Sequence, residues 1–484
     1  MVNKHRNPVI ILILGLCTAL LMGACLDDLV RPPGNYVFDP NRFWVVDFTT
    51  SNYYQISADK IFDGNNCEIW AERGSEINEK QAQEIANEYD NKIHELMLQN
   101  FSIDSVSYTS GGTEKNFNNI LELANYLVNG NGKLIILLLD IRDLYGVNGN
   151  NSYIAGYFDP VNFYLNYSNS NFRNMIYIDI NPGMKDKTGM YSTFAHELQH
   201  LINYVTSMCR RSREKSDIPN RLDTWIDEGL SSQAEHLYQG KPLDGRINWF
   251  LGNNTSKGLI DKGNNFFVWG NHANTDYTEL DDYATVYLFF TWLYIQSGEN
   301  AAIFKDIINS TRTDYRAVTE MAAKIESGWG TWETLLRTWH IANYLNTSTG
   351  RFGYEHKNDS RNRLSAITVK PLAGTTNISL YPGEAVYSRI SACAVTPTIS
   401  SVNIRYAGLT KGSTVVNLAP PSYSGAMLLT FNANNSRHGN AEPGYLTGVS
   451  ANMGISAATA FLEETPIDLP AMYIIDHRDL LRNK

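Results

Sequence analysis

Residues 194–204 read FAHELQHLINY, and this stretch decides the predicted fold. It contains an H-E-x-x-H pattern, and the four-residue offset places His196 and His200 on one helix face, where both can bind a single zinc ion. Glu197 projects beside them as a candidate general base. The alternative is a surface helix with two solvated histidines. A helix from Thr188 onward is predicted by apolar residues spaced three and four apart, namely Met190, Phe194, Leu198, Leu201 and Val205.

A zinc site needs a ligand beyond His196 and His200, and Glu228 is the candidate. The metzincin continuation requires a glycine and a third histidine, but Asn203 and Thr206 occupy those positions. Glu228 follows His200 after 27 intervening residues, within the stretch WIDEGL. That stretch has a helical pattern of its own, so the sequence predicts a second helix that carries the third ligand.

This spacing resembles that of the gluzincin metallopeptidases, in which a glutamate on a second helix completes a His₂Glu site. The resemblance implies that His196, His200 and Glu228 bind one zinc ion. Glu235 lies about two helical turns after Glu228, and in aminopeptidase-like gluzincins a glutamate at this offset accepts a hydrogen bond from a ligand histidine. The alternatives are that Glu228 or Glu235 is a solvated carboxylate, or that Asp227 or Glu235 replaces Glu228 as the ligand.

A longer resemblance, to the hyicolysin-type bacterial zinc metallopeptidases, covers roughly residues 60–345. It rests on GYFDP, YIDINP, FAHELQHLINY and WIDEGLSSQAEHLY. It implies an α+β, zincin-like fold with a mixed-sheet lobe and a helical lobe. It also implies an endopeptidase that acts on peptide or protein substrates near neutral pH. In such folds the edge strand beside the cleft can pair with an extended substrate, and residues 174–180 are the predicted edge strand.

The donor that stabilises the oxyanion is less well defined. Tyr283 aligns with the tyrosine that has this role in aminopeptidase-like gluzincins, where Y-x-x-G-A is typical. Val286 and Tyr287 occupy the glycine and alanine positions here. Tyr283 is therefore either the donor or a packed helix residue, and His236, His272 and Tyr287 are the other candidates.

The first 24 residues are predicted to be an export signal, with a short basic region followed by an apolar run too short to span a bilayer comfortably. Residues 21–25 (LMGAC) resemble a bacterial lipobox, in which Cys25 receives the lipid. The alternative is a plain secretory signal. The prediction is an exported bacterial lipoprotein of the cell envelope, held by its N-terminal lipid in the outer membrane, at its periplasmic face or at the cell surface.

Composition argues against several other classes of protein. The net charge of -10, with 40 basic and 50 acidic residues, gives no basic face for nucleic acid. Neither a G-x-S-x-G elbow nor a Walker-type glycine loop occurs in the chain. Outside the signal and Cys25, the cysteines are Cys67, Cys209 and Cys393, whose pairing the sequence leaves open.

Two loops carry weaker signals. Asp143–Ser152 offers oxygen ligands that suit calcium, but it lacks an EF-hand pattern. A basic cluster lies between the two predicted zinc-site helices and is interpreted as a solvated loop. The cluster comprises Arg210, Arg211, Arg213 and Lys215.

The chain divides into five predicted parts. The last part is interpreted as an all-β domain, because half of the 16 prolines lie there and apolar residues alternate near position 404. The parts are the signal (1–24), a tether (25–45), an N-terminal α/β lobe (46–187), the active-site helices with the helical lobe (188–350) and a C-terminal β domain (365–484). Strands are predicted at 133–141 and 174–180, and further helices at 81–99, 224–238, 282–296, 301–309 and 331–345.

Two functional hypotheses follow. The first is a zinc-dependent endopeptidase. The second is a binding or adhesion lipoprotein that keeps zinc for structure. A structural zinc site is normally closed by four protein ligands, so three ligands beside an intact Glu197 favour the endopeptidase.

Overall fold

The computed structural model describes most of the chain between residues 39 and 355. The described residues are 39–110, 113–150, 152–165, 167–211, 220–251, 267, 279–355, 364, 378–380, 382–389, 398–399, 404–409, 415–416, 427–433, 444–447 and 471–476. The predicted export signal, Cys25, His272 and Cys393 lie outside these residues. Within the described part, no helix combines the length and the apolar character needed to cross a bilayer.

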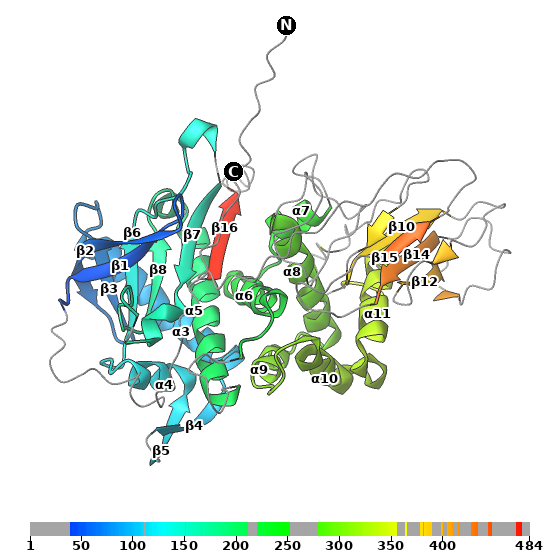
Figure 1. Cartoon of the computed structure of the whole chain (residues 1–484), viewed down its shortest axis with the longest axis horizontal. Coiled ribbons are helices and arrows are strands. Elements are labelled where there is room, and N and C mark those ends of the chain that lie inside the picture. Colours follow the sequence, from blue (N-terminus) through cyan, green and yellow to red (C-terminus); the bar gives the residue numbers. More distant parts are fainter. Residues whose placement is uncertain are drawn as a thin grey trace, which may run out of the picture.

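A seven-stranded mixed sheet forms one lobe of the molecule (Figure 1). Its strand order is β1-β2-β3-β6-β8-β7-β16, in which β3, β6 and β8 run parallel and the other neighbours pair antiparallel. The strands span Arg42–Asp47 (β1), Asn52–Asp63 (β2), Cys67–Glu72 (β3), Leu134–Leu139 (β6), Ser152–Phe158 (β7), Met175–Asp179 (β8) and Ala471–Asp476 (β16).

Strand β6 shows why this sheet is buried on both faces. Its sequence, LIILLL, is apolar throughout, as expected of a central parallel strand. Ile136 and Leu138 point into the main core with the helices, whereas Leu137 and Leu139 join a second cluster on the opposite face. The same two-residue alternation places Ile176 and Tyr177 of β8 on opposite faces.

Helices cover the sheet and then form the second lobe. The long helix α5 (Lys187–Arg210) follows β8 directly and packs against both β7 and β8. Beside it lies α6 (Thr224–Gln239), which in turn packs on α8 (Glu279–Gln296). The other helices are α2 (Glu79–Glu88), the π-helical turn η1 (Tyr89–Ile93), α3 (His94–Asn100), α4 (Ile120–Leu127), α7 (Asp244–Phe250), α9 (Ala302–Ile308), α10 (Tyr315–Ile325) and α11 (Trp332–Leu345).

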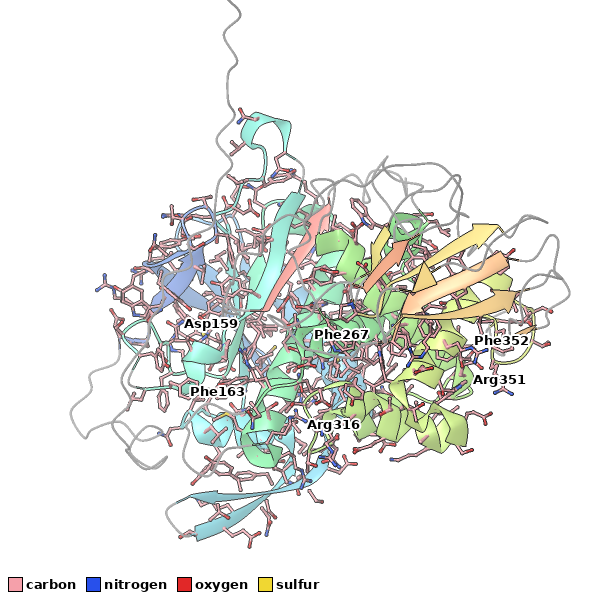
Figure 2. All side chains as sticks on the ribbon, turned by 45° about the vertical axis from the view of Figure 1, so that its right-hand side comes forward. Asp159, Phe163, Phe267, Arg316, Arg351 and Phe352 are labelled. Carbon is pink, nitrogen blue, oxygen red and sulfur yellow. The ribbon has the colours of Figure 1, made fainter. Side chains whose placement is uncertain are left out.

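Helix α8 is the centre of the helical lobe. Its residues 281–293 are all buried, which is typical of a helix surrounded by other elements. Phe289 and Phe290 contact Trp225 at the start of α6. Phe267, labelled in Figure 2, contacts the same indole ring. This aromatic cluster fixes the N-terminal end of α6, the helix that carries Glu228.

Among the described residues of the C-terminal region, strands form two small antiparallel sheets, with the orders β10-β14-β12-β13 and β11-β15-β9. Their strands are β9 (Ile378–Leu380), β10 (Ala385–Arg389), β11 (Thr398–Ile399), β12 (Ile404–Leu409), β13 (Val415–Val416), β14 (Met427–Asn432) and β15 (Gly444–Thr447). A separate C-terminal β domain stays a prediction.

A separate antiparallel hairpin, in the N-terminal part of the chain, is formed by β4 (Asp104–Ser110) and β5 (Thr113–Asn119).

The strand arrangement corrects three expectations. Residues 174–180 do not form an edge strand, because β8 lies between β6 and β7. The expected tether 25–45 ends earlier than predicted, since β1 begins at Arg42. Residues 471–476, expected within the C-terminal β domain 365–484, instead pair antiparallel with β7 in the large sheet.

Candidate metal centre

Helix α5 brings the two predicted histidines together. It begins after the N-cap Asp186, whose carboxylate accepts a hydrogen bond from the Gly189 amide at 3.1 Å. His196 and His200 then lie on successive turns of one face, with ring centroids 4.8 Å apart. Both side chains are buried, so the two solvated histidines of the alternative hypothesis are not what the structure contains.

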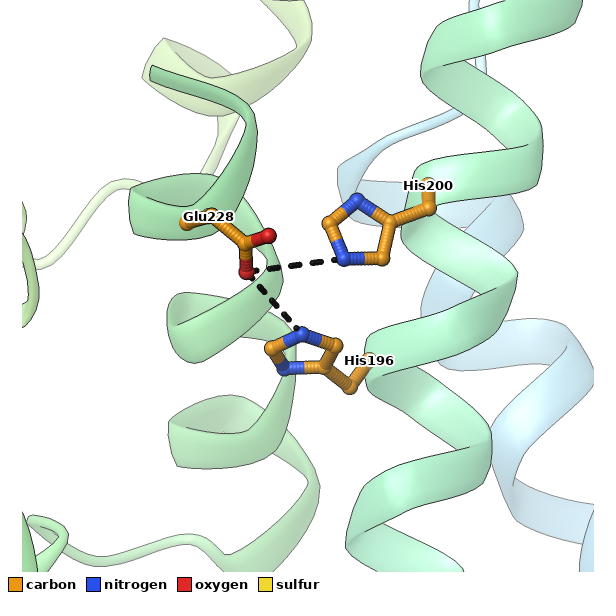
Figure 3. Close-up of side chains that lie close together, drawn as sticks. All are labelled: His196, His200 and Glu228. Carbon is orange, nitrogen blue, oxygen red and sulfur yellow. Dashed lines mark ion pairs between the residues drawn. The ribbon is translucent and has the colours of Figure 1, made fainter. Parts of the chain in front are cut away.

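Glu228 approaches the same point from α6. Its Oε2 lies 3.3 Å from His196 Nε2 and 3.6 Å from His200 Nε2 (Figure 3). One ligand atom from each of the three residues falls within 4.8 Å of the others. Glu228 therefore faces the two imidazoles instead of solvent.

Two further carboxylates hold the far sides of the imidazoles. Glu235 Oε1 lies 2.9 Å from His196 Nδ1, and Asp227 Oδ2 lies 3.1 Å from His200 Nδ1. Neither points to the place where Glu228 meets the two Nε2 atoms. A carboxylate at Nδ1 favours the tautomer with hydrogen on that nitrogen, which directs the lone pair of Nε2 toward Glu228.

The imidazoles and carboxylates of the site shift one another's pKa values in opposite directions. Burial raises the pKa of the Glu228 carboxyl, but the imidazoles of His200 and His196 outweigh burial and lower it to about 2. Burial lowers the pKa of His200, but the carboxylates of Asp227 and Glu228 raise it by more than burial lowers it. The pKa of His200 therefore lies well above its usual value. Glu228 is thus an anion at neutral pH, ready to attract a cation.

Glu197 is the other reactive group of α5. Its side chain is fully buried, and neither carboxylate oxygen has a hydrogen-bond partner among the described residues. Burial raises the pKa of Glu197 to about 7, although both neighbouring histidines act against this. A carboxyl group with a pKa near neutral pH is suited to both accepting and donating a proton.

The donor set fits a zinc ion. Two imidazole nitrogens and one carboxylate oxygen are common zinc ligands, and three protein ligands leave room for a water molecule. Each histidine also has the carboxylate at its second nitrogen that zinc sites commonly show. His196, His200 and Glu228 are therefore the residues that could hold the metal.

The candidates for the oxyanion donor lie in different surroundings from one another. Tyr283 is buried against Tyr153 and Ala155 of β7, with the Arg246 guanidinium 4.7 Å from the centre of its ring. The Tyr287 hydroxyl accepts a hydrogen bond from the Leu243 amide at 2.8 Å.

The same Tyr287 hydroxyl lies 3.1 Å from His236 Nδ1. Tyr287 and His236 thus belong to one internal network, and His272 lies outside the described residues. Both roles considered for Tyr283, oxyanion donor and packed helix residue, stay predictions.

The weaker sequence signals have mixed outcomes. For Arg211 the predicted solvated position is wrong: it is buried and donates to the carbonyl oxygens of Ile308 and Ser310, both at 2.8 Å. Arg210 is exposed, and Arg213 and Lys215 lie outside the described residues. Cys67 and Cys209 are free thiols. The Asp143 carboxylate accepts hydrogen bonds from the amides of Tyr145 and Ile154, and calcium binding by this loop stays a prediction.

Sequence reasoning missed the role of three residues around His200. The sequence presents Asp227 only as a possible replacement ligand, and Asn203 only as a residue that breaks the metzincin pattern. Asn203 donates to Asp227 Oδ1 at 2.6 Å, and the Ser231 hydroxyl lies 3.2 Å from His200 Nδ1. Asn203 stands three residues after His200, so helical periodicity was the one available signal.

Comparison with known proteins indicates the class of enzyme. Neutral metalloprotease ShpI of Staphylococcus hyicus is 28% identical over 340 residues, which cover 69% of this chain and 68% of the relative. No protein-family model matches the chain. The chain is a distant homologue of that metalloprotease. The homology and the intact His-His-Glu site together support a metalloendopeptidase.

Proposed function

We propose that this chain is a zinc-dependent endopeptidase in which Glu197 is the general base. One observation carries the proposal: His196, His200 and Glu228 converge in a buried site next to a carboxylate whose oxygens have no hydrogen-bond partner among the described residues. The distant homology to a neutral metalloprotease supports the same class of reaction.

The chemistry divides between the metal and the protein. A zinc ion held by His196, His200 and Glu228 would lower the pKa of a bound water and polarise the scissile carbonyl. Glu197 accepts a proton from the attacking water and later delivers it to the leaving amine, so that it ends the cycle unchanged. Glu235 and Asp227 hold the imidazoles of His196 and His200 in one tautomer through this cycle.

The deciding experiment is Glu197→Gln, a nearly isosteric change that removes the proton acceptor. The variant should bind one zinc ion per chain, measured by elemental mass spectrometry, and should lose cleavage of casein by a factor of about 10² or more. Undiminished cleavage would reject the mechanism. A wild-type protein that binds zinc but cleaves neither casein nor a peptide library would support the adhesion lipoprotein instead.

We further propose that the mature protein is an exported lipoprotein anchored through Cys25. The support is the LMGAC stretch after an apolar run near the N-terminus. In a bacterial host, wild-type protein should incorporate labelled palmitate and remain in the membrane fraction. Cys25→Ala should lose the label, and wild-type protein without label would reject the anchor.

A further inference from the structure

A chain of hydrogen bonds leads from a buried arginine to one of the zinc ligands. Arg211 Nη2 donates to Asn203 Oδ1 at 3.0 Å, and Asn203 Nδ2 donates to Asp227 Oδ1 at 2.6 Å. The other oxygen of Asp227 lies 3.1 Å from His200 Nδ1. Three side chains thus connect the C-terminal end of α5 to the imidazole of His200.

This series of hydrogen bonds has a fixed direction because Arg211, its first member, can only donate. A guanidinium has no acceptor, so the oxygen of the Asn203 amide must face Arg211 and its NH₂ group must face Asp227. An ionised Asp227 only accepts, and one of its oxygens already accepts from Asn203. The nitrogen of His200 that faces Asp227 is therefore the one that carries hydrogen.

Ser231 does not decide the tautomer. Its hydroxyl lies 3.2 Å from His200 Nδ1 and 3.3 Å from His200 Nε2, and it is also within hydrogen-bond distance of Gln199 Oε1 and of the Asp227 carbonyl oxygen. The contact with the Asp227 carboxylate is therefore what assigns the hydrogen to Nδ1.

Arg211 is held firmly enough to act as the fixed end. It is 4% exposed and donates to the carbonyl oxygens of Ile308 and Ser310, at the end of α9, and to the Ser207 hydroxyl at 2.7 Å. Burial lowers the pKa of Arg211 only to about 10, so the guanidinium stays charged at neutral pH. Its direction of donation is therefore constant.

We propose that Arg211, through Asn203 and Asp227, is a positioning residue that fixes the tautomer of His200 and so keeps the Nε2 lone pair available to the metal. The inference rests on the proposed zinc site, and it adds a remote arginine to the residues on which metal affinity depends. It predicts that substitutions that leave every zinc ligand in place will still weaken zinc binding.

The first test is Asp227→Asn in the full chain. Because Asn203 donates to position 227, the new amide must turn its oxygen toward Asn203 and its NH₂ group toward His200. His200 Nδ1 then becomes an acceptor, and hydrogen moves to Nε2. In the metal-free protein, at a pH above the raised pKa of His200 where its imidazole is neutral, ¹⁵N NMR should show Nδ1–H for His200 in the wild type and Nε2–H in the variant. The zinc dissociation constant, from competition with a chromophoric chelator, should rise about 10- to 100-fold.

The second test is Asn203→Asp, which preserves shape and still accepts from Arg211. The new carboxylate has no N–H group to donate to Asp227. The series of hydrogen bonds is therefore interrupted between positions 203 and 227, where two carboxyl groups face each other. Zinc affinity should fall about tenfold or more. Zinc affinity should fall less in Arg211→Lys, which retains N–H donors at this place, than in Arg211→Met, which has none.

A matched control is Gln233→Met on α6. Gln233 is a buried amide that donates to Thr291 Oγ1 at 2.9 Å and to the Tyr287 carbonyl oxygen at 3.2 Å, away from the metal ligands. Its loss should lower the melting temperature and leave the zinc dissociation constant within about twofold.

The positioning role is overturned if Asp227→Asn and Asn203→Asp behave like that control, with reduced stability but unchanged zinc affinity and the wild-type tautomer of His200. Zinc affinity and the NMR signature need no turnover, so a protein that binds zinc but cleaves no peptide would reject the proposed activity alone. Failure of the wild type to bind zinc would reject both.

Discussion

A Cβ atom added to Gly229 would lie 2.2 Å from Cδ2 of Phe290, closer than any side-chain carbon can approach an aromatic ring. The glycine that follows Glu228 therefore lets α8 close against α6. We expect Gly229→Ala to lower the free energy of unfolding by about 1–3 kcal/mol, because the ring must move in a packed core. Urea unfolding of the zinc-bound protein measures this change.

Gly328→Ala is the matched control for that prediction. Apart from Gly328 and its chain neighbours, no heavy atom of the described residues lies within 4 Å of the Cβ position at Gly328, and we expect a change within about 0.5 kcal/mol. Equal effects of the two alanines would contradict the packing role assigned to Gly229. A loss of zinc affinity in Gly229→Ala would further show that the α6–α8 contact positions Glu228.

Removal of zinc should destabilise the protein. The site gathers three ligands that a cation would hold together, and binding to the folded state alone stabilises it by about 2.7 kcal/mol at a free zinc concentration 100 times the dissociation constant. A chelator should lower the melting temperature, and added zinc should restore it. Glu228→Gln, which lacks one anionic ligand, should give a smaller difference, and an identical difference would exclude Glu228 as a ligand.

Tyr283→Phe distinguishes the two hypotheses for this tyrosine. Its ring packs against β7 and the Arg246 guanidinium, and this arrangement suits a packing role. We therefore expect kcat to stay within about threefold of the wild type, whereas loss of an oxyanion donor costs about 10²–10³ in kcat. Steady-state kinetics on one peptide substrate make the measurement, and a loss of the larger size would assign Tyr283 to the reaction.

The free energy of unfolding should also depend on pH through Asp179, which is not a residue of the metal centre. Burial raises the pKa of Asp179 to about 8, although the amides of Ile141 and Gly183 donate to its oxygens. Between about pH 4 and pH 8 the unfolded chain releases this proton while the folded protein keeps it, so the free energy of unfolding falls as the pH rises. Asp179→Asn should remove this contribution, which is at most about 1.4 kcal/mol per pH unit. Urea unfolding from pH 5 to pH 8 tests it, and equal slopes for the two proteins would contradict it.

Much of the metal centre follows from helical periodicity, which is local and visible in sequence. The offsets of four residues between His196 and His200, and of seven between Glu228 and Glu235, place each pair on one face. The pairing of Asp227 with His200 joins two helices, and no spacing along the chain encodes it. A charged side chain is normally exposed, which is why the sequence predicts a solvated Arg211, whereas α5 and the end of α9 together supply enough acceptors to bury it.

Strand existence was easier to predict than strand order. The apolar runs of β6 and β8 identify buried strands by composition alone. Their neighbours depend on contacts between distant segments: β7 returns antiparallel beside β8, and β16 comes from more than 300 residues later in the chain. For this reason residues 174–180 were mistaken for an edge strand.

The pairing of β16 with β7 also bears on how shorter versions of the protein should be designed. A chain that stops after α11 would retain every residue of the metal centre but would leave the amides and carbonyls along one side of residues 152–158 without their present partner strand. Bare strand edges recruit other chains, so such a fragment is expected to self-associate. Preparations intended for crystallisation or kinetics are therefore better made with residues 471–476 retained.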